Sequence, residues 1–498
     1  MSKLLQLNPR DNVAVALEPL AAGVALEGLT LLDAIPMGHK VALRALSPGQ
    51  AVIKYGYPIG KATQEIPAGS HIHSHNLRSG LEDESAPAQE NETHAATPQK
   101  TSAPATFLGY LRPDGRVGIR NELWIINTVA CVNFPAEKIA QVARQKYGAP
   151  DSGIDGVYSF SHPYGCSQLG DDLGHTRSLL ASLARHPNAA GVLIMGLGCE
   201  NNQLKAFLDQ IGPFDSQRVK FFNAQEVEDE VETGLQLIDE LAAYAATFHR
   251  QPLPASKLVL GMKCGGSDGF SGITANPLVG RVSDWISGQG GSALLSEVPE
   301  MFGAEQVLRE RATTPEIAGR FDHLISGFKD YFHRHHEPVN ENPSPGNKDG
   351  GITTLEEKSL GCVQKGGVSP VREIFDYGQT LTVPLGGIGL VNAPGNDGVS
   401  TSAMAAAGAH LILFTTGRGT PLGTPVPTLK IASNSSLAER KPLWIDFDAG
   451  RLLSGKSLDD LTVQLVELIL ATASGQSRAR NEINGYREIA IWKDGVTL

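Results

Sequence analysis

Cysteine is scarce in this chain, with five among 498 residues. A small, odd number of cysteines does not make the dense disulfide framework of a small secreted protein. Four of the five adjoin glycine, and none stands in the plain apolar run in which a core cysteine usually packs. We therefore expect loop thiols in a reducing compartment, and a cytoplasmic protein.

Long apolar runs and an excess of basic residues are also missing. No window approaches the roughly 18 apolar residues of a membrane span, and the start of the chain lacks a signal-peptide pattern. Lys and Arg number 42 against 53 Asp and Glu, a net charge of −11. Nucleic acids and acidic membranes need a basic surface, so we expect neither as a partner. A small anionic ligand remains compatible, because a few local Arg and Lys side chains suffice for it.

Changes in composition divide the chain. Residues 1–77 carry short apolar pieces separated by turn signals, which predicts a small domain of short β-strands. Residues 78–106 contain almost no large apolar side chain, so we expect a flexible linker there. Beyond it we expect a first α/β region over residues 107–250 and a second over residues 251–498. The chain is long enough for this number of cores.

After the linker, apolar strand-like runs alternate with helix-like segments such as ETGLQLIDELAAYAATF. This alternation predicts an α/β fold with a parallel, Rossmann-like sheet and crossover helices. We expect strands in eight runs: GVYSFSH, AGVLIMGLG, VKFFNAQ, KLVLGMKCGG, SALLSEVPE, IGLVNAPGND, AHLILFTTGRG and TLKIASNS.

Polar residues follow these runs, where the strands are predicted to end. In open parallel sheets, ligands bind where the carboxyl ends of the strands meet. The residues so placed are Ser161, His162 and Cys166; Cys199, Glu200, Asn201 and Asn202; Lys263, Cys264, Ser267 and Asp268; Glu297; Asn396 and Asp397; and Thr415, Thr416 and Arg418. One polar strand end is ordinary, whereas six predict a single site assembled from many loops.

Two of these strand ends carry thiols beside other metal-binding side chains. Cys199 adjoins Glu200, and Cys166 lies near His162, so sulfur, oxygen and nitrogen donors are present. Such donors suit iron or zinc. There is no C-x-x-C pair, so a metal site would have to be assembled in three dimensions. A cysteine nucleophile with a histidine base explains the same residues, and the spacing does not separate the two hypotheses.

The segment GSHIHSHN places His71, His73 and His75 at alternate positions. An extended segment would turn all three imidazoles to one face. That face could hold a metal ion, or it could meet solvent at the end of the first domain.

Two strand ends offer groups for binding an anion. CGGSDGFSGITANP supplies backbone N–H groups and hydroxyls, although its spacing is neither a P-loop nor a dinucleotide fingerprint. FTTGRGTP presents Arg418, whose planar fork suits a carboxylate. We expect the substrate to contact Ser267, Asp268, Asn396, Asp397, Thr416 and Arg418.

Several longer motifs carry a resemblance to a known family. They are DGRVGIRNELWI, SHPYGCSQLGDD, MGLGCENNQ, CGGSDGFSGITANP, SEVPEMFGAEQ, ENPSPGNKDGGITTLEEKSLGC, NAPGNDGVSTSA and TTGRGTP. The chain resembles the altronate/galactarate dehydratase family, to which a sulfolactate sulfo-lyase is related. The resemblance runs nearly end to end and departs only in the linker. Its N-terminal part, HKVALRALSPGQAVIKYGYPIG, is similar to a SAF-type β-clip module.

The resemblance implies a hydro-lyase that converts D-altronate to 2-dehydro-3-deoxy-D-gluconate, or acts on a related sugar acid such as galactarate. It also implies Fe²⁺ or Mn²⁺, with an iron–sulfur cluster left open. A thiol-dependent hydrolase or transferase and a non-catalytic sugar-acid sensor are the alternatives.

From the residues, we expect the metal to be held by Cys166, Cys199, Glu200 and Cys362. Proton transfer is assigned to His71, His73, His162 and Lys365. We expect a homodimer. We also expect the N-terminal domain to act as a lid that delivers a histidine, and a chain beginning near Thr106 to fold without it.

Overall fold

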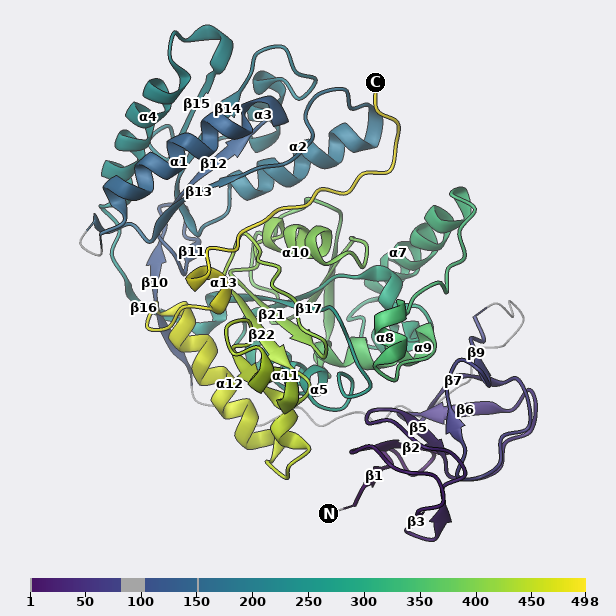
Figure 1. Ribbon diagram of the computed structural model, residues 1–498. Helices are drawn as coiled ribbons and strands as arrows, with labels where there is room; N and C mark the ends of the chain where they lie inside the picture. Colours follow the sequence, from purple (N-terminus) through teal and green to yellow (C-terminus); the bar gives the residue numbers. More distant parts are fainter. Residues whose placement is uncertain (1, 82–103, 150–151) are drawn as a thin grey trace.

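The computed structural model describes residues 2–81, 104–149 and 152–498. Three units follow one another along the chain (Figure 1): an N-terminal β unit, a smaller α/β unit and a larger α/β unit. Residues 82–103 of the predicted linker lie outside the described residues. At its two edges, β9 covers Leu77–Arg78 and β10 begins at Thr106. Within the described ranges, no helix is long and apolar enough to cross a membrane.

The N-terminal unit consists of short antiparallel strands, as predicted. One sheet has the order β1-β2-β5-β8, a second has the order β6-β7-β9, and β3 pairs with β4. The strands are β1 (Leu4–Leu5), β2 (Val13–Ala16), β3 (Ala25–Leu26), β4 (Leu29–Thr30), β5 (Lys40–Ala42), β6 (Ala51–Lys54), β7 (Tyr57–Ala62), β8 (His71–Ile72) and β9 (Leu77–Arg78).

Part of the core of the N-terminal unit is shared with the larger α/β unit. Val52, Ile59 and Ile72 belong to the same buried cluster as Leu278 and Phe321. Removing residues 1–81 would therefore expose apolar side chains of the larger unit. This packing argues against a loosely attached lid and against independent folding of the remaining chain.

The smaller α/β unit begins with an antiparallel ribbon and continues into a parallel sheet. The ribbon has the order β11-β10-β16, and the sheet has the order β13-β12-β14-β15. Its elements are β10 (Thr106–Leu111), β11 (Val117–Gly118), β12 (Glu122–Asn127), α1 (Asn133–Tyr147), β13 (Gly156–Phe160), α2 (Gly170–Ala184), β14 (Ala189–Gly196), α3 (Leu204–Ile211), β15 (Val219–Asn223), α4 (Glu230–Ala245) and β16 (Gln251–Pro254). The carboxylate of Asp229 caps α4 by accepting hydrogen bonds from the backbone N–H groups of Val231 and Glu232.

The larger α/β unit is built on a seven-stranded parallel sheet of order β19-β20-β18-β17-β21-β22-β23. Its strands are β17 (Val259–Cys264), β18 (Ser292–Leu295), β19 (Val371–Phe375), β20 (Gly387–Val391), β21 (Leu411–Thr416), β22 (Thr428–Ala432) and β23 (Phe447–Asp448). Its helices are α5 (Ala275–Gly288), α6 (Glu305–Arg309), α7 (Pro315–Arg334), α8 (Pro345–Asp349), α9 (Leu355–Cys362), α10 (Asp397–Ala406), α11 (Ser435–Arg440), α12 (Leu458–Ala473) and α13 (Arg480–Ile483).

The eight predicted runs all coincide with parallel strands, and the α/β class is confirmed. Among the parallel strands, the runs omit β12, β19 and β23. The strand β19 lies at the edge of its sheet and exposes part of its side chains, so its sequence lacks a continuous apolar run.

The order of the seven strands fixes where a ligand site can form. The chain leaves β17 toward β18 and β20 on one side, and later returns to β21 on the other side. The neighbours β17 and β21 thus mark the topological switch point, where the crossover connections diverge and leave a crevice.

Candidate active site

The strand β17 ends at the switch point with Lys263 and Cys264, both buried. A Cβ atom on the following Gly265 would lie 2.5 Å from Asp397 Oδ2, so only glycine lets the chain pass α10 this closely. Gly266 has φ of +60°, in the left-handed region that glycine adopts without strain. The two glycines therefore keep the end of β17 against the start of α10.

Cys264 meets a second thiol and a carboxylate in the buried crevice. Its Sγ lies 3.2 Å from the Sγ of Cys362, which ends α9, and 3.3 Å from Oε2 of Glu300. Cys362 Sγ lies 3.1 Å from the same oxygen. Their three donor atoms lie within 4.8 Å of one another, the one such group of three His, Cys, Asp or Glu donors in the described part of the chain. We call Cys264, Glu300 and Cys362 the buried donor set.

Three buried lysines surround the donor set. Lys365 Nζ lies 2.8 Å from Cys264 Sγ and donates to Glu297 Oε2 at 2.9 Å. Lys358 Nζ lies 2.8 Å from Glu300 Oε1. Lys263 pairs with Glu297 and, at 3.0 Å, with Asp397. Each buried charge thus faces a group of opposite charge or a thiol, as burial of charge requires.

The neighbouring charges decide the protonation states in this crevice. Burial alone would lower the pKa of each lysine, but nearby carboxylates and thiols more than offset it and raise the pKa of Lys263, Lys358 and Lys365. Burial would raise the pKa of Glu300, yet the lysines hold it well below its usual range. The hydrogen bond with Cys264, together with burial, raises the pKa of the Cys362 thiol. The crevice therefore holds fixed ammonium groups around an ionised carboxylate.

Glu297 occupies an unusual backbone conformation next to the donor set. Its φ of 68° and ψ of 51° place a non-glycine residue in the left-handed region, which costs about 1 kcal/mol. The Oε2 atom accepts a hydrogen bond from the backbone N–H of Cys264 at 3.2 Å. The strained turn thus aims the carboxylate at the end of β17.

The N-terminal unit contributes to the walls of the site. Tyr55 lines a small pocket together with Ser267, Lys358 and Cys362. Next to it, Lys40 and Lys54 each lie 2.8 Å from a carboxylate oxygen of Glu357 on α9. Burial would raise the pKa of Glu357, but these two ammonium groups hold it well below its usual range. The site thus lies at the junction of the N-terminal and larger units.

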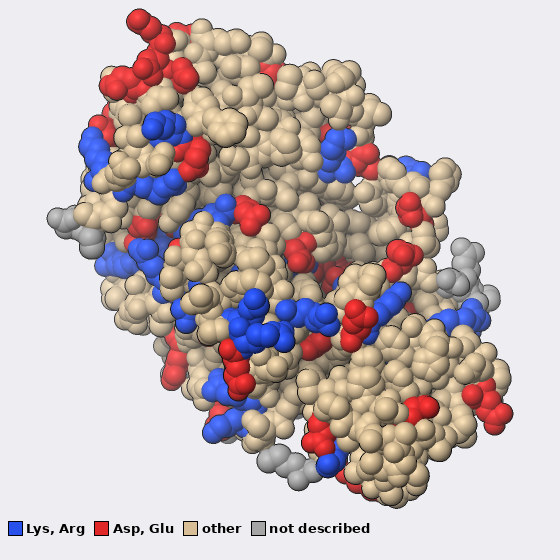
Figure 2. All heavy atoms as spheres, in the orientation of Figure 1, with Lys and Arg blue, Asp and Glu red and all other residues tan. Residues whose placement is uncertain are grey.

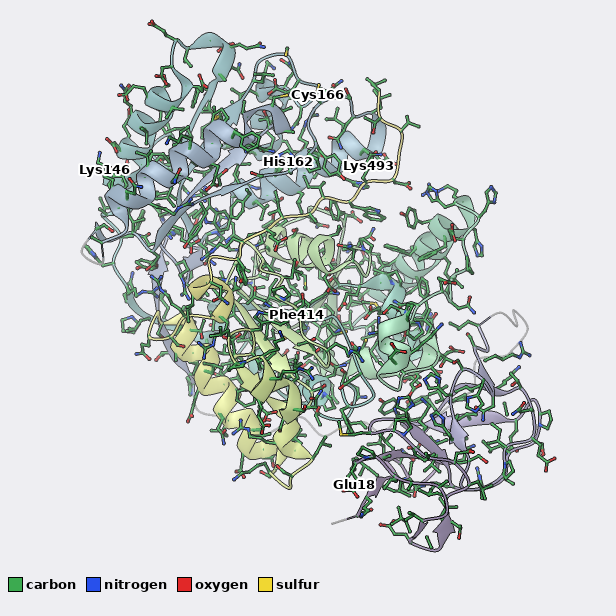
Figure 3. The ribbon with its side chains drawn as sticks, viewed as in Figure 1. Glu18, Lys146, His162, Cys166, Phe414 and Lys493 are labelled. Atoms are coloured by element: carbon green, nitrogen blue, oxygen red, sulfur yellow. The ribbon has the colours of Figure 1, made fainter. Side chains whose placement is uncertain are left out.

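Only one of the four predicted metal ligands belongs to the donor set, namely Cys362. Cys166, Cys199 and Glu200 lie in the smaller α/β unit, and Figure 3 shows Cys166 well away from Phe414 on β21. Glu200 accepts hydrogen bonds from Thr128 Oγ1 and from two backbone N–H groups of its own loop, so its carboxylate holds that loop in place. The sequence-based ligand set is therefore not one site.

Of the predicted proton-transfer residues, Lys365 lies in the crevice and the histidines do not. The raised pKa of Lys365 keeps it protonated, so it is a hydrogen-bond donor rather than the predicted base. His162 lies in the smaller unit, where Nε2 donates to the carbonyl of Asn127 at 2.8 Å and Nδ1 accepts from the N–H of Tyr164 at 3.2 Å. Both ring nitrogens of His162 are therefore engaged in hydrogen bonds with the backbone.

The histidines of the N-terminal unit pack on α8 instead of reaching the donor set. His73 Nε2 lies 2.9 Å from the carbonyl oxygen of Lys348, and His71 Nε2 lies 3.0 Å from Nδ1 of His39. His39 Nε2 in turn lies 3.3 Å from the carbonyl oxygen of Asp349. Burial lowers the pKa of His71 to about 4, so this ring is neutral at pH 7.

Some of the predicted substrate-binding side chains already form hydrogen bonds within the protein, whereas others are available to a ligand. Asp268 accepts hydrogen bonds from Ser271, Ser433, Asn434 and the backbone of Phe270, and therefore holds its own loops. Thr416 and Asn396 likewise accept backbone hydrogen bonds, from Gly419 and Val399.

Three predicted contacts remain available. The Ser267 hydroxyl is buried without a hydrogen-bond partner, and it lines the pocket. The Asp397 side chain is 36% exposed, in contrast to Glu297 at 2%. Arg418 is exposed, and within the described ranges its guanidinium has no ion pair. These three groups can meet a ligand that enters the crevice.

The predicted metal, proton-transfer and substrate roles were given to none of the crevice residues Lys263, Cys264, Glu297, Glu300 and Lys358. The first three were recognisable as polar residues at predicted strand ends. Glu300 and Lys358 do not lie at strand ends. A short turn carries Glu300 to the crevice, and the buried helix α9 carries Lys358.

On the face shown in Figure 2, Lys and Arg side chains are interspersed with Asp and Glu. This distribution agrees with the net charge of −11 and with a site whose positive charge is buried.

Three family models match successive parts of the chain. They are the altronate/galactarate dehydratase SAF domain over residues 2–80, the D-galactarate dehydratase/altronate hydrolase second domain over 109–246, and the D-galactarate/altronate dehydratase C-terminal domain over 255–497. The three matches correspond to the three units of the fold.

Whole-chain comparisons agree with the models. The chain is 46% identical over 510 residues to the altronate dehydratase of Bacillus subtilis, covering 100% of both chains. It is 47% identical over 498 residues to the altronate dehydratase of Escherichia coli, covering 99% of both. The galactarate dehydratase (L-threo-forming) of E. coli is 32% identical over 518 residues, covering 98% of this chain and 96% of its own.

A crevice of fixed cations, carboxylates and thiols at the switch point of a parallel sheet, on a chain with these relatives, defines a hydro-lyase. The chain belongs to the altronate/galactarate dehydratase family.

Proposed function

We propose that the protein dehydrates D-altronate to 2-dehydro-3-deoxy-D-gluconate. The observation that carries this proposal is identity of 46% and 47% to two altronate dehydratases over essentially the whole chain, against 32% to a galactarate dehydratase. The reaction removes the proton on C2, beside the carboxylate, and expels the 3-hydroxyl group as water. Negative charge develops on the carboxylate oxygens as the C2 proton leaves, so a site for this chemistry needs fixed positive charge.

The buried donor set fits an Fe²⁺ ion, with Mn²⁺ as the alternative. Two sulfurs and one carboxylate oxygen within 4.8 Å can serve one ion, and thiolate donors favour iron over manganese. Cys362 must lose its proton to bind, so metal affinity rises with pH. When bound, the metal supplies Lewis-acid stabilisation of negative charge on a substrate oxygen.

The lysines supply the other positive charges of the mechanism. Lys263, Lys358 and Lys365 are held as ammonium groups before substrate arrives, so they stabilise developing charge without reorganisation. The leaving hydroxyl needs a proton, and Lys365 carries one beside Cys264 and Glu297.

Asp397 is the carboxylate that we assign as the base for the C2 proton. Its side chain is the exposed partner of Lys263, whereas Glu297 and Glu300 are almost fully buried and paired. Arg418 binds the substrate carboxylate at the mouth of the crevice. The His71 and His73 cluster acts as a positioning group, because it holds α8, whose Asn347 donates to the carbonyl of Ser267 at 2.8 Å.

The test is an anaerobic assay of D-altronate and galactarate side by side with Fe²⁺ or Mn²⁺. We expect altronate turnover to dominate and to stop on chelation. Asp397→Asn should lose C2 proton exchange with deuterated water while still binding altronate. Preferred turnover of galactarate, or undiminished turnover after full metal removal, would contradict the proposal.

For partners and location, we propose a cytoplasmic homodimer that acts on a small sugar acid. Phe134, at the start of α1, is 88% exposed, and a contact with a second copy at this position would bury its ring. Light scattering of the purified protein and of Phe134→Ser measures this directly. A monomeric mass for the unchanged protein would refute the dimer.

A further inference from the structure

Three cysteines remain outside the buried donor set, and all lie at one edge of the four-stranded sheet. Cys131 follows β12, Cys166 follows β13 and Cys199 follows β14. These strands are adjacent and parallel, in the order β13-β12-β14. All three thiols are free and exposed. The fold therefore gathers three unpaired thiols at the carboxyl ends of three neighbouring strands.

The three loops that carry these thiols are fixed to one another. The N–H of Ala130 donates to the carbonyl of Tyr164 at 2.8 Å, which joins the Cys131 loop to the Cys166 loop. The N–H of Asn202 donates to the carbonyl of Gly165 at 2.9 Å, which joins the Cys199 loop to the Cys166 loop. Asn202 Nδ2 donates to the carbonyl of Thr128 at 3.1 Å, which joins the Cys199 loop to the Cys131 loop.

Other polar groups nearby maintain this arrangement and leave the thiols accessible. Glu200 accepts a hydrogen bond from Thr128, and both ring nitrogens of His162 form hydrogen bonds with the backbone of these loops. Ser167 has φ of 58°, a left-handed conformation that its N–H secures by donating to Asn201 Oδ1 at 2.8 Å. For Cys199, the contact is a hydrogen bond of 3.4 Å from Gln225 Nε2. The strain and the buried polar groups thus hold exposed cysteines in place.

The spacing of these thiols distinguishes between kinds of metal group. Four ligands around a single ion, at bonds of about 2.3 Å to sulfur, stand roughly 4 Å apart. In the described part of the chain only the buried donor set is that compact, so the three loop thiols are spread more widely. A cluster of several irons bridged by sulfide ions takes thiolates that are more widely separated.

We infer that Cys131, Cys166 and Cys199 bind an iron–sulfur cluster. Binding replaces the three thiol protons with bonds to iron and leaves the oxidation state of the cysteines unchanged. Cys131 lies in the 3-10 turn Ala130–Val132 that leads directly into α1. Three thiolates leave one position of a four-iron cluster open to water or to an oxygen ligand. The inference does not depend on the proposed substrate, because the donor set uses the other two cysteines.

The test is reconstitution of the full-length protein with iron and sulfide under anaerobic conditions. We expect roughly four acid-labile sulfides per chain, the content of a four-iron cluster, and the broad visible absorption of iron–sulfide charge transfer. Cys131→Ser, Cys166→Ser and Cys199→Ser should each lose most of both signals. Circular dichroism and thermal unfolding show whether each variant remains folded.

Cys362→Ser is the matched control, because it removes a thiol from the buried donor set. It should keep the sulfide content and the visible absorption while losing Mn²⁺ binding at the crevice. Iron without acid-labile sulfide, or a disulfide formed among the three loop thiols in reconstituted protein, would overturn the inference. Unchanged sulfide content in the three folded loop variants would overturn it as well.

Discussion

The two parallel sheets of this protein both carry thiols at their carboxyl ends, but they surround them differently. At the seven-stranded sheet, Cys264 and Cys362 are buried among three lysines and two glutamates. At the four-stranded sheet, Cys131, Cys166 and Cys199 are exposed on loops held together mainly by backbone and amide hydrogen bonds.

This difference shows that a cysteine beside glycine at a strand end does not by itself define its chemistry. Charged neighbours from distant segments, such as Glu300 and Lys358, make the crevice of the larger unit an electrostatic site. In the smaller unit, the Glu200 carboxylate accepts hydrogen bonds from its own loop, and Arg177 donates to Asn202 Oδ1 at 3.0 Å. Substitutions at the two sheets should therefore have different effects.

The largest effect is expected when a thiol of the crevice is removed. Cys264→Ser should lower kcat by at least about a thousandfold, equivalent to ~4 kcal/mol, because it takes away a metal donor and the partner of Lys365. Mn²⁺ titration and steady-state kinetics measure this. Cys166→Ser should leave Mn²⁺ affinity at the crevice unchanged, and equal losses in both variants would abolish the distinction between the strand ends.

The buried ion pairs between the N-terminal and larger units come next. Glu357→Gln would leave Lys40 and Lys54 buried without a counter-charge and should reduce the free energy of unfolding by about 4 kcal/mol. Urea unfolding measures the loss. The control Asp209→Asn breaks the exposed Lys205–Asp209 pair and should change stability by less than about 0.5 kcal/mol.

A smaller effect follows from a buried histidine between the two α/β units. His410 Nδ1 accepts a hydrogen bond from the N–H of Val259 at 3.0 Å, and burial lowers the pKa of His410 to about 4 from 6.5. The folded protein therefore binds fewer protons than the unfolded chain between these pH values. Its contribution to stability is complete above pH 6.5 and is lost as the pH falls to 4, by about 3 kcal/mol.

Urea titrations across this pH range measure that contribution. The His410→Asn variant should lose the corresponding part of the slope, whereas His323→Asn, at an exposed position, should retain it. An unchanged slope in His410→Asn would assign the pH dependence to other groups.

The smallest effect is expected at the mouth of the crevice. Arg418→Lys keeps the charge but loses the planar fork, so KM for the sugar acid should rise about tenfold, or ~1.4 kcal/mol, with kcat nearly unchanged. The exposed Arg440→Lys serves as the control. Wild-type kinetics in Arg418→Lys would mean that another group binds the substrate carboxylate.

Much of the fold followed from the sequence, because buried parallel strands are continuous apolar runs such as AGVLIMGLG. The location of polar strand ends also identified Lys263, Cys264 and Glu297 as site candidates. The sequence could not show which strand ends meet, since that depends on the division into two sheets. Cys166 and Cys362 were therefore assigned to one ligand set although separate sheets carry their surroundings. Glu300 and Lys358 were missed because their role arises from tertiary packing alone.

The left-handed backbone of Glu297 has a consequence for attempts to engineer this protein. Glycine at this position would relieve a strain of about 1 kcal/mol and remove a buried carboxylate, so part of the stability lost with the ion pairs would be regained. Screens that reward heat resistance alone would therefore tolerate Glu297→Gly better than Glu297→Ala, while both changes remove the carboxylate that orients Lys263 and Lys365. The strain at Glu297 therefore persists because its carboxylate balances two buried ammonium groups, and glycine would recover only part of the stability lost with them.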